Sequence, residues 1–252
     1  MCLILFAHQL RAELPLMLLA NRDEYLARAT APMACWAEAP DVVGGRDLVA
    51  GGSWLGAGAD GRWAAVTNVR EGESSLPGAP SRGWLVRDYL QGRATPEAFI
   101  AGLVPQMAAY AGFNLLVSDG DSLRYASNRG GTPTELAPGI YGLSNHLLDS
   151  PWPKLVSARR RAAGAIAALP DHAALFSLLA DDEIVRDDEL PATGVPLEWE
   201  RLLSAIFVRS ADYGTRASTV VTVGSAGDID FAECSFAPGG VPLQSSVIST
   251  AV

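Results

Sequence analysis

The chain has 252 residues, 49% of them hydrophobic and 19% charged, which is enough apolar material for a substantial core in an ordinary globular protein. Its formal net charge of −9 repels phosphate backbones and argues against a nucleic-acid partner. Charged and polar residues interrupt the N-terminal apolar runs, which argues against a membrane span, and three scattered cysteines argue against a disulfide framework. We expect a single domain over residues 1–252 in a soluble, cytoplasmic protein.

The predicted elements of the first half begin with hairpins. Strands are predicted over 2–9 and 14–21, around 33–36 and 41–44, and in a hairpin over 53–68 that turns at Asp60-Gly61. Two helices follow over 81–90 and 96–110, with Ser81 and Thr95 as their N-caps. The stretch 71–83 is rich in Pro, Gly and Ser and is predicted as a surface loop.

The second half has the same kinds of element. A hairpin is predicted over 113–128 and a strand over 139–145. Helices are predicted over 153–169, 171–180 and 196–208, the second of them capped by Asp171. A last hairpin over 217–236 is rich in β-branched residues, and the Pro-, Gly- and Ser-rich stretch 238–246 is predicted as a loop.

Strands therefore arrive as hairpins and helices in blocks, an order that favours antiparallel sheets over a parallel sheet of alternating β-α units. Several strands are apolar at nearly every position, which is typical of strands buried on both faces. Two such sheets stacked between helical layers satisfy both observations. The sequence thus predicts an α+β fold, a four-layer αββα sandwich of two antiparallel sheets between helices.

A cysteine directly follows the initiator methionine. A small residue at this position usually allows the methionine to be removed, which would leave Cys2 with a thiol and a free α-amino group. Such a residue combines a nucleophile with a base of pKa about 7.7–8.0. Cys2 is therefore a candidate catalytic residue.

The quartet Asn21, Arg22, Asp23 and Glu24 ends the second predicted strand. Alternation along the strand turns Asn21 and Asp23 to one face and Arg22 and Glu24 to the other. If the first two strands pair as a hairpin, Cys2 lies beside this quartet. A guanidinium group near a thiol favours the thiolate, and a carboxylate can hold an ammonium group. The alternative is an exposed turn whose charges pair among themselves.

Three further polar residues end or enter apolar strands. Asn68 and Asn145 each follow a strand, where a side-chain amide can donate to an oxyanion or simply form a turn. Arg216 stands at the start of the last strand pair and needs a partner, either a structural carboxylate or a substrate anion.

Together these residues carry a resemblance. "MC" at the start, "NRDE", "GGSWLG", "TNVR", "GLSNHLLDSPWPK" and "YGTRAST" resemble the NRDE family, also called Transport and Golgi organization 2-like, from position 1 to about 219. The resemblance implies the αββα architecture of the N-terminal nucleophile hydrolases. More remotely, the layout is similar to that of bile-salt hydrolases and penicillin V acylases.

Carried over, the resemblance implies site residues. Cys2 would be nucleophile and base, with Arg22 and Asp23 around it. Asn68 and Asn145 would be amide donors, and Arg216 would neutralise charge. In those hydrolases two residues separate the Arg from the Asp, whereas here they are adjacent and point to opposite faces of a strand.

The first functional hypothesis is a cysteine hydrolase of amide or thioester bonds that needs no cofactor and acts on a small acyl compound. Glu24 and Asn21 of the quartet, Trp54 of "GGSWLG" and His146 are candidate ligand-binding residues. Trp152 of "DSPWPK" either packs across a rigid loop or forms a wall of the cleft.

The second hypothesis is a carrier of haem or of an acyl-CoA or lipid, because the NRDE family is implicated in haem trafficking and lipid homeostasis. His8 or His146 would be the axial ligand, with Cys2 a further candidate, although no CxxCH motif is present. No cluster of histidines or carboxylates has metal-ligand spacing. The pattern does not determine the oligomeric state.

Overall fold

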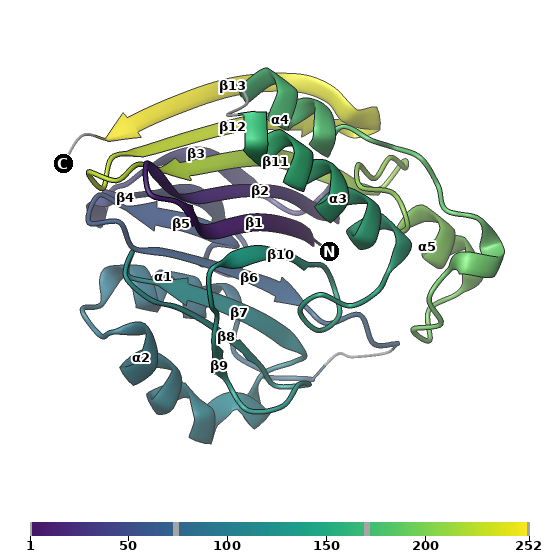
Figure 1. Ribbon diagram of the computed structural model, residues 1–252. Coiled ribbons are helices and arrows are strands. Elements are labelled where there is room, and N and C mark those ends of the chain that lie inside the picture. Colours follow the sequence, from purple (N-terminus) through teal and green to yellow (C-terminus); the bar gives the residue numbers. More distant parts are fainter. Residues whose placement is uncertain (1, 73–75, 169–171, 251–252) are drawn as a thin grey trace.

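Two antiparallel sheets form the centre of the molecule (Figure 1). The computed structural model describes residues 2–72, 76–168 and 172–250, and for Cys2, residues 166–168 and Thr250 it describes the backbone alone. The strands are β1 (Cys2–Arg11), β2 (Leu14–Tyr25), β3 (Thr30–Trp36), β4 (Ala39–Asp47), β5 (Leu55–Gly58), β6 (Trp63–Asn68), β7 (Phe113–Ser118), β8 (Leu123–Ser127), β9 (Thr134–Glu135), β10 (Gly139–Leu143), β11 (Tyr213–Val223), β12 (Ile229–Ala237) and β13 (Val241–Thr250). The helices are α1 (Gly83–Gln91), α2 (Pro96–Leu103), α3 (Pro153–Ala168), α4 (His172–Leu179) and α5 (Leu197–Leu202), with 3₁₀ segments η1 (Val104–Ala109), η2 (Asp187–Glu189) and η3 (Pro238–Gly240).

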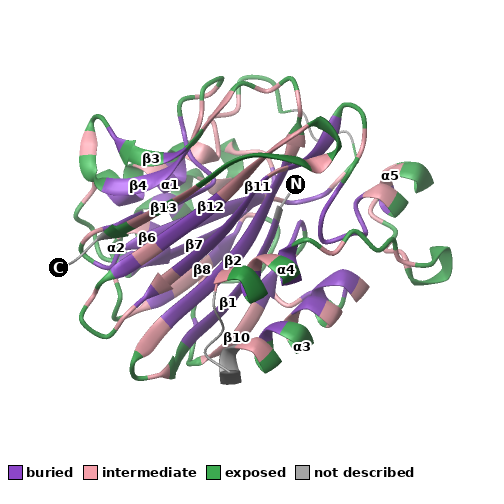
Figure 2. Ribbon diagram, turned by 90° about the horizontal axis from the view of Figure 1, so that it is seen from above, coloured by how far each residue is buried: buried purple, intermediate pink, exposed green. Residues whose placement is uncertain are grey.

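Three apolar clusters join four layers. The first sheet has the strand order β10-β1-β2-β11-β12-β13 and the second β3-β4-β5-β6-β7-β8-β9. Ile4 and Phe6 of β1 pack against Leu116 of the second sheet, whereas Leu3 and Leu5 pack against α3 and α4. A third cluster packs α1 and α2 on the second sheet, and Figure 2 shows buried residues concentrated in the strands. The predicted αββα sandwich of antiparallel sheets is confirmed.

The helix starts agree with the sequence pattern at Thr95 but not at Ser81. Thr95 caps α2, because its Oγ1 accepts a hydrogen bond from the N–H of Ala98 at 3.2 Å. The predicted cap at Ser81 is wrong: α1 begins at Gly83, and Arg82 in the N-cap position makes no side-chain capping bond. Asp171 lies outside the described residues.

Two predicted helices are shorter than their patterns indicated. The helix predicted over 96–110 ends at Leu103 and continues as η1, because Pro105 has no N–H for an α-helical hydrogen bond. The helix predicted over 196–208 contains only α5, and residues 203–208 run on as a buried segment. Because residues 203–208 are all buried, their apolar pattern does not require a helix with one apolar face.

The predicted loop over 238–246 is also wrong, because residues 241–250 form β13. β13 pairs antiparallel with β12, from Ala237 opposite Val241 to Ile229 opposite Thr250. Gly239 and Gly240 form the turn between them with φ of 74° and 76°, values that favour glycine. The small and polar residues of this stretch gave no strand pattern in the sequence, because only one face of β13 packs against the core.

A buried carboxyl group links the sheets. Glu233 of β12 is 3% exposed, and its Oε1 accepts a hydrogen bond from the backbone N–H of Met33 in β3 at 2.7 Å. Its Oε2 accepts a hydrogen bond from Thr219 Oγ1 at 3.2 Å. Burial raises the pKa of Glu233, and the two hydrogen bonds offset part of that effect.

We expect Glu233→Gln to remove a pH-dependent loss of stability. The raised folded-state pKa means that wild-type stability falls as pH rises above the ordinary value of 4.5 and stops falling above the folded pKa. Urea unfolding measured from pH 4 to pH 8 should therefore show the variant gaining free energy of unfolding relative to wild type. The exposed control Glu183→Gln should not change with pH in this way. A constant difference between Glu233→Gln and wild type would contradict the prediction.

Candidate active site

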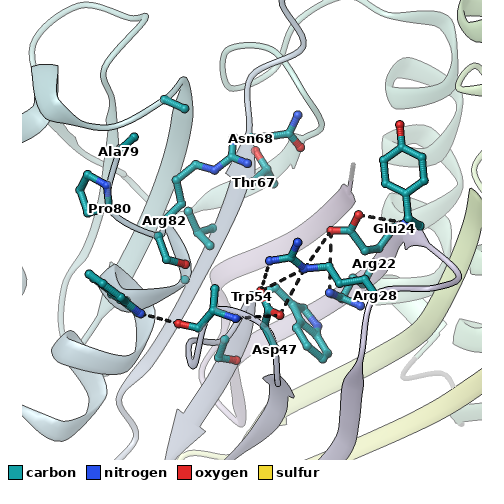
Figure 3. A pocket seen from close by; sticks show the side chains of 18 of the residues that line it. Arg22, Glu24, Arg28, Asp47, Trp54, Thr67, Asn68, Ala79, Pro80 and Arg82 are labelled. Carbon is teal, nitrogen blue, oxygen red and sulfur yellow. Dashed lines mark hydrogen bonds and ion pairs between the residues drawn. The ribbon is translucent and has the colours of Figure 1, made fainter. Parts of the chain in front are cut away.

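A cleft of about 640 Å³ opens at the ends of β2 and β6, beside the loop that leads into α1 (Figure 3). Its walls come from both sheets and carry charged, amide and aromatic side chains. The described polar and aromatic residues that line it include Arg22, Asp23, Glu24, Tyr25, Arg28, Asp47, Trp54, Asn68, Arg82 and Trp84. A volume of this size is typical of a small-molecule site.

The pairing of β1 with β2 sets Cys2 opposite Arg22. The predicted hairpin is therefore present, and its register is the one that the candidate site needs. On the other side of β2, Ala217 of β11 pairs with Arg22, so the three strands meet at this point. The side chain of Cys2 lies outside the described residues, and its roles as nucleophile and base stay predictions.

Arg22, Glu24 and Trp54 meet in the cleft. Arg22 is 5% exposed, and its guanidinium carbon lies 4.2 Å from the centroid of the Trp54 ring, a cation–π contact. Its Nη1 donates to Thr30 Oγ1 at 3.1 Å, and its Nη2 lies 3.9 Å from Glu24 Oε2. Arg22 thus lies against an aromatic face, and Glu24 is a distant carboxylate partner.

Asn21 points to the opposite face of β2, as the alternation predicts. It is fully buried, and its Nδ2 donates to the carbonyl oxygens of Leu179 and Ile206, both at 2.8 Å. Its Oδ1 accepts a hydrogen bond from Ser218 Oγ at 2.6 Å. Since protein groups engage both ends of the amide, Asn21 holds the end of α4 against the sheet, and the expected ligand contact stays a prediction.

Asp23 is 1% exposed and is among the residues that line the cleft. Its Oδ1 accepts a hydrogen bond from Thr215 Oγ1 at 2.7 Å. Burial raises the pKa of Asp23, and the nearby positive charges of Lys154 and Arg70 work against this rise. The carboxyl group therefore lies among buried cations rather than in solvent.

The two predicted asparagines are in direct contact. Asn145 is fully buried, and its Nδ2 donates to Oδ1 of Asn68 at 2.9 Å and to the backbone oxygen of Asn68 at 3.2 Å. Both amide hydrogens of Asn145 are thereby used. Asn68 is the member of the pair that lines the cleft, and its Nδ2 makes a long bond of 3.4 Å to the carbonyl of Val69.

Arg216 is not among the described residues that line the cleft, although the charges of Arg22 and Glu24 act on it. Its Nη1 donates to the carbonyl oxygens of Tyr25, Leu26 and Arg28 at 3.0 to 3.1 Å. It lines a smaller hollow of about 170 Å³ together with Glu233 and Trp54. The guanidinium group thus clamps the turn between β2 and β3, and its predicted charge-neutralising role stays a prediction.

The histidines and Trp152 also lie outside the described lining of the cleft. His8 is 4% exposed, burial lowers its pKa, and it pairs with Gly139 at the far end of β1 from Cys2. His146 is exposed and its Nδ1 is 2.7 Å from Ser150 Oγ, while its ring lies against Trp152. Of the two readings of Trp152, packing across a rigid loop agrees with this position.

Arg28, Asp47 and Arg82 were not predicted. Arg28 Nη2 donates to Asp47 Oδ2 at 2.7 Å, and Arg82 Nη1 donates to the carbonyl of Gly112 at 2.9 Å. Burial raises the pKa of Asp47, but the hydrogen bonds from Arg28 and from the backbone N–H groups of Val49 and Ala50, together with the charge of Arg28, outweigh burial and lower the pKa below its ordinary value. In the sequence these three residues are isolated charges near turns, and no pattern distinguishes them from ordinary charged residues of the surface.

Within residues 2–72, 76–168 and 172–250 no group of three or more histidine, cysteine or acidic side chains could hold a metal ion. Within the same residues no helix has the length and apolarity to cross a membrane. The described groups of the cleft can favour a thiolate and donate hydrogen bonds to an oxygen.

The chain is similar in sequence to the proteins of one family. Residues 1–238 match the family described as Transport and Golgi organisation 2. The Transport and Golgi organization protein 2 homolog of Bos taurus is 35% identical over 257 residues, which cover 92% of each chain. The Homo sapiens homolog is 32% identical over 258 residues, again 92% of each chain. The Drosophila melanogaster protein is 31% identical over 261 residues, 92% of this chain and 91% of that protein.

Two solved structures have a similar course of the chain. A conjugated bile acid hydrolase from Clostridium perfringens superposes with a TM-score of 0.48 and 10% identity, covering 98% of this chain and 92% of that one. An N-acylethanolamine-hydrolyzing acid amidase ortholog from Caenorhabditis elegans superposes with a TM-score of 0.45 and 12% identity, covering 89% and 93%.

We expect Gly45→Ala to disturb the floor of the cleft. A Cβ atom at Gly45 would lie 2.2 Å from Cη2 of Trp54, so the indole ring, which also contacts the guanidinium group of Arg22, must shift. Overpacking of this kind costs about 1–3 kcal/mol of stability. The control Gly102→Ala in α2 meets nothing within 4 Å and should be neutral or stabilising by up to about 1 kcal/mol. Urea unfolding compares the two, and equal stabilities would contradict the expectation.

Proposed function

The chain belongs to the Transport and Golgi organisation 2 family, and we propose that it hydrolyses amide or thioester bonds with Cys2 as the nucleophile. The observation that carries the proposal is the register of β1 and β2, which sets Cys2 opposite the cleft-lining Arg22. A positively charged guanidinium group near a cysteine favours the thiolate form, and the pairing puts the backbone of Cys2 next to that of Arg22. The 640 Å³ cleft beside Arg22 is large enough for a small acyl compound.

In the proposed reaction, methionine removal first frees the α-amino group of Cys2. This amine takes the thiol proton, and Sγ attacks the substrate carbonyl carbon. The bond from the carbonyl carbon to the leaving sulfur or nitrogen breaks, and the leaving group takes the proton from the amine. Water then attacks the acyl-enzyme, which releases the acid and restores the thiol. No cofactor takes part.

Asn68 is the proposed donor to the oxyanion. Its Oδ1 accepts a hydrogen bond from Asn145 Nδ2 at 2.9 Å, which fixes the amide plane and leaves Nδ2 of Asn68 on the cleft side. Asn145 is then a positioning residue, because both of its amide hydrogens are bound to Asn68. A preorganised neutral amide is suited to a charge that appears only in the transition state.

The chemistry requires a reduced thiol, so we place the protein in the cytoplasm. Carriage of an acyl ligand or haem is the competing function, and it would need the same cleft without bond cleavage. For haem, neither His8 nor His146 is among the described residues that line the cleft. Cys2, the further candidate ligand, pairs with the cleft-lining Arg22, so haem carriage in this cleft would depend on the same residue as hydrolysis.

We expect Cys2→Ala to abolish turnover of a panel of acyl thioesters and amides, because the variant has no nucleophile. Cys35→Ala, at an exposed free cysteine, should hydrolyse them like wild type. Mass spectrometry of the intact wild-type protein should show that Met1 is absent. Equal turnover by wild type and Cys2→Ala, or a retained methionine on active protein, would contradict the mechanism, and ligand binding without turnover in wild type would indicate a carrier.

Asn68→Ala should lower kcat by roughly 10²–10³-fold with a smaller change in KM, since the lost donor acts in the transition state. Asn145→Ala should lower kcat in the same direction by freeing the Asn68 amide. Gln106→Ala, an exposed amide on η1, is the matched control and should leave both constants unchanged. Steady-state kinetics on the best thioester measures all three, and a wild-type kcat in Asn68→Ala would remove Asn68 from the mechanism.

A further inference from the structure

A second hollow of about 390 Å³ adjoins the cleft. The two share four lining residues, Glu24, Tyr25, Asn68 and Arg82, so the proposed reaction site stands at their junction. The far wall of the hollow consists of Val195, Pro196, Trp199 and Tyr213. The cleft therefore has one half next to Arg22 and a second half next to α5. The second, the aromatic half, is lined by Tyr25, Trp199 and Tyr213 beside the charged residues Glu24, Arg70, Glu71 and Arg82.

Three aromatic rings form the wall of this second half. The ring centroids of Tyr25 and Tyr213 are 5.2 Å apart, those of Trp199 and Tyr213 are 5.4 Å apart, and those of Tyr25 and Trp199 are 6.4 Å apart. These are tilted and edge-to-face contacts within the range that aromatic pairs prefer. Tyr213 is 5% exposed and its hydroxyl donates to the backbone oxygen of Asp23, whereas Tyr25 remains 54% exposed. One ring thus supports the group and another is left open to the hollow.

The helix that carries Trp199 is fixed by a buried ion pair. α5 has six residues and stands at one end of the molecule, beyond the strand ends (Figures 1 and 2). Arg70 Nη1 donates to Glu200 Oε2 at 2.6 Å, and the side chains are 1% and 5% exposed. Glu200 Oε1 accepts hydrogen bonds from the N–H and Oγ1 of Thr193 at 2.8 and 2.6 Å. A helix this short has little stability of its own, so these bonds hold the aromatic wall in place.

The position of the wall along β2 sets its distance from the reaction site. Tyr25 is three residues beyond Arg22, the residue that pairs with Cys2, which corresponds to about 10 Å along a strand. A short methylene spacer covers this distance. A ring attached through such a spacer can therefore contact Tyr25 while its carbonyl group lies near Asn68.

We propose that the aromatic half is a binding subsite for a flat, ring-bearing acyl group of the substrate. The proposal rests on the proposed function, because it places the acyl side of the scissile bond toward α5 and the leaving group toward Arg22. Contact with the open face of Tyr25 and with Trp199 favours a planar ring over a flexible alkyl chain, which loses more conformational entropy on binding. The subsite therefore selects among acyl groups and takes no part in bond cleavage.

Isothermal titration of the Cys2→Ala protein tests this without turnover. The probes are S-(4-phenylbutanoyl)-N-acetylcysteamine and S-decanoyl-N-acetylcysteamine, whose acyl groups both have ten carbons and differ in the presence of the ring. We expect the phenyl compound to bind about 3- to 10-fold more tightly, the ratio that one aromatic contact supplies. Adding Tyr25→Ala or Trp199→Ala should remove the preference, and Tyr25→Phe or Trp199→Phe should retain it.

Leu197→Ala is the matched control, because Leu197 is on the same helix, is 49% exposed and does not line the hollow. It should leave the preference unchanged. Equal affinities for the two probes, no binding of the phenyl compound, or a preference that survives both alanine substitutions would overturn the subsite. If wild type hydrolysed both probes equally well, the subsite would be overturned and the proposed function would stand. If the phenyl compound bound more tightly but neither probe was hydrolysed, the subsite would stand and the proposed function would be overturned.

Discussion

The antiparallel register of β1 and β2 is the constraint on which the candidate site depends. Because side chains alternate along β2, a shift of one residue would turn Arg22 into the helical layer and Asn21 into the cleft. The partners on both faces stabilise the observed register, since Asn21 binds carbonyl groups near α4 and Arg22 lies over Trp54. One pairing thus positions Cys2 relative to every residue of the quartet.

The end of the sandwich that holds the site is polar inside, unlike the apolar centre of the sheets. Asp23, Lys154 and the pair Arg70–Glu200 are nearly or fully buried there. A buried charge is costly unless it has partners, and loss of one partner leaves the other unpaired at low dielectric. These groups therefore hold the strand ends and α5 rigidly, which is what a preorganised site needs.

The same arrangement links the proposed chemistry to the proposed selectivity. Asn68 is shared by both halves of the cleft, with Arg22 lining only the first and Trp199 only the second. Residues that would act on the carbonyl group belong to the sheets, whereas the aromatic wall depends on a short helix fixed by one ion pair. The proposed chemistry and the proposed selectivity therefore depend on different parts of the fold, the sheets and α5.

The sequence by itself determined the layers, the hairpins and the alternation of the quartet, because apolar periodicity and turn residues are local properties that neighbouring positions reveal. It also identified Arg22, Glu24, Trp54 and Asn68 as site candidates, all of which line the cleft. Only the tertiary structure decided that Asn145 supports Asn68, that Arg216 clamps a turn, and that residues 241–250 form an edge strand. It alone brought Tyr25, Trp199 and Tyr213 together, since they are up to 188 positions apart and their contact depends on how the strands and α5 pack in space.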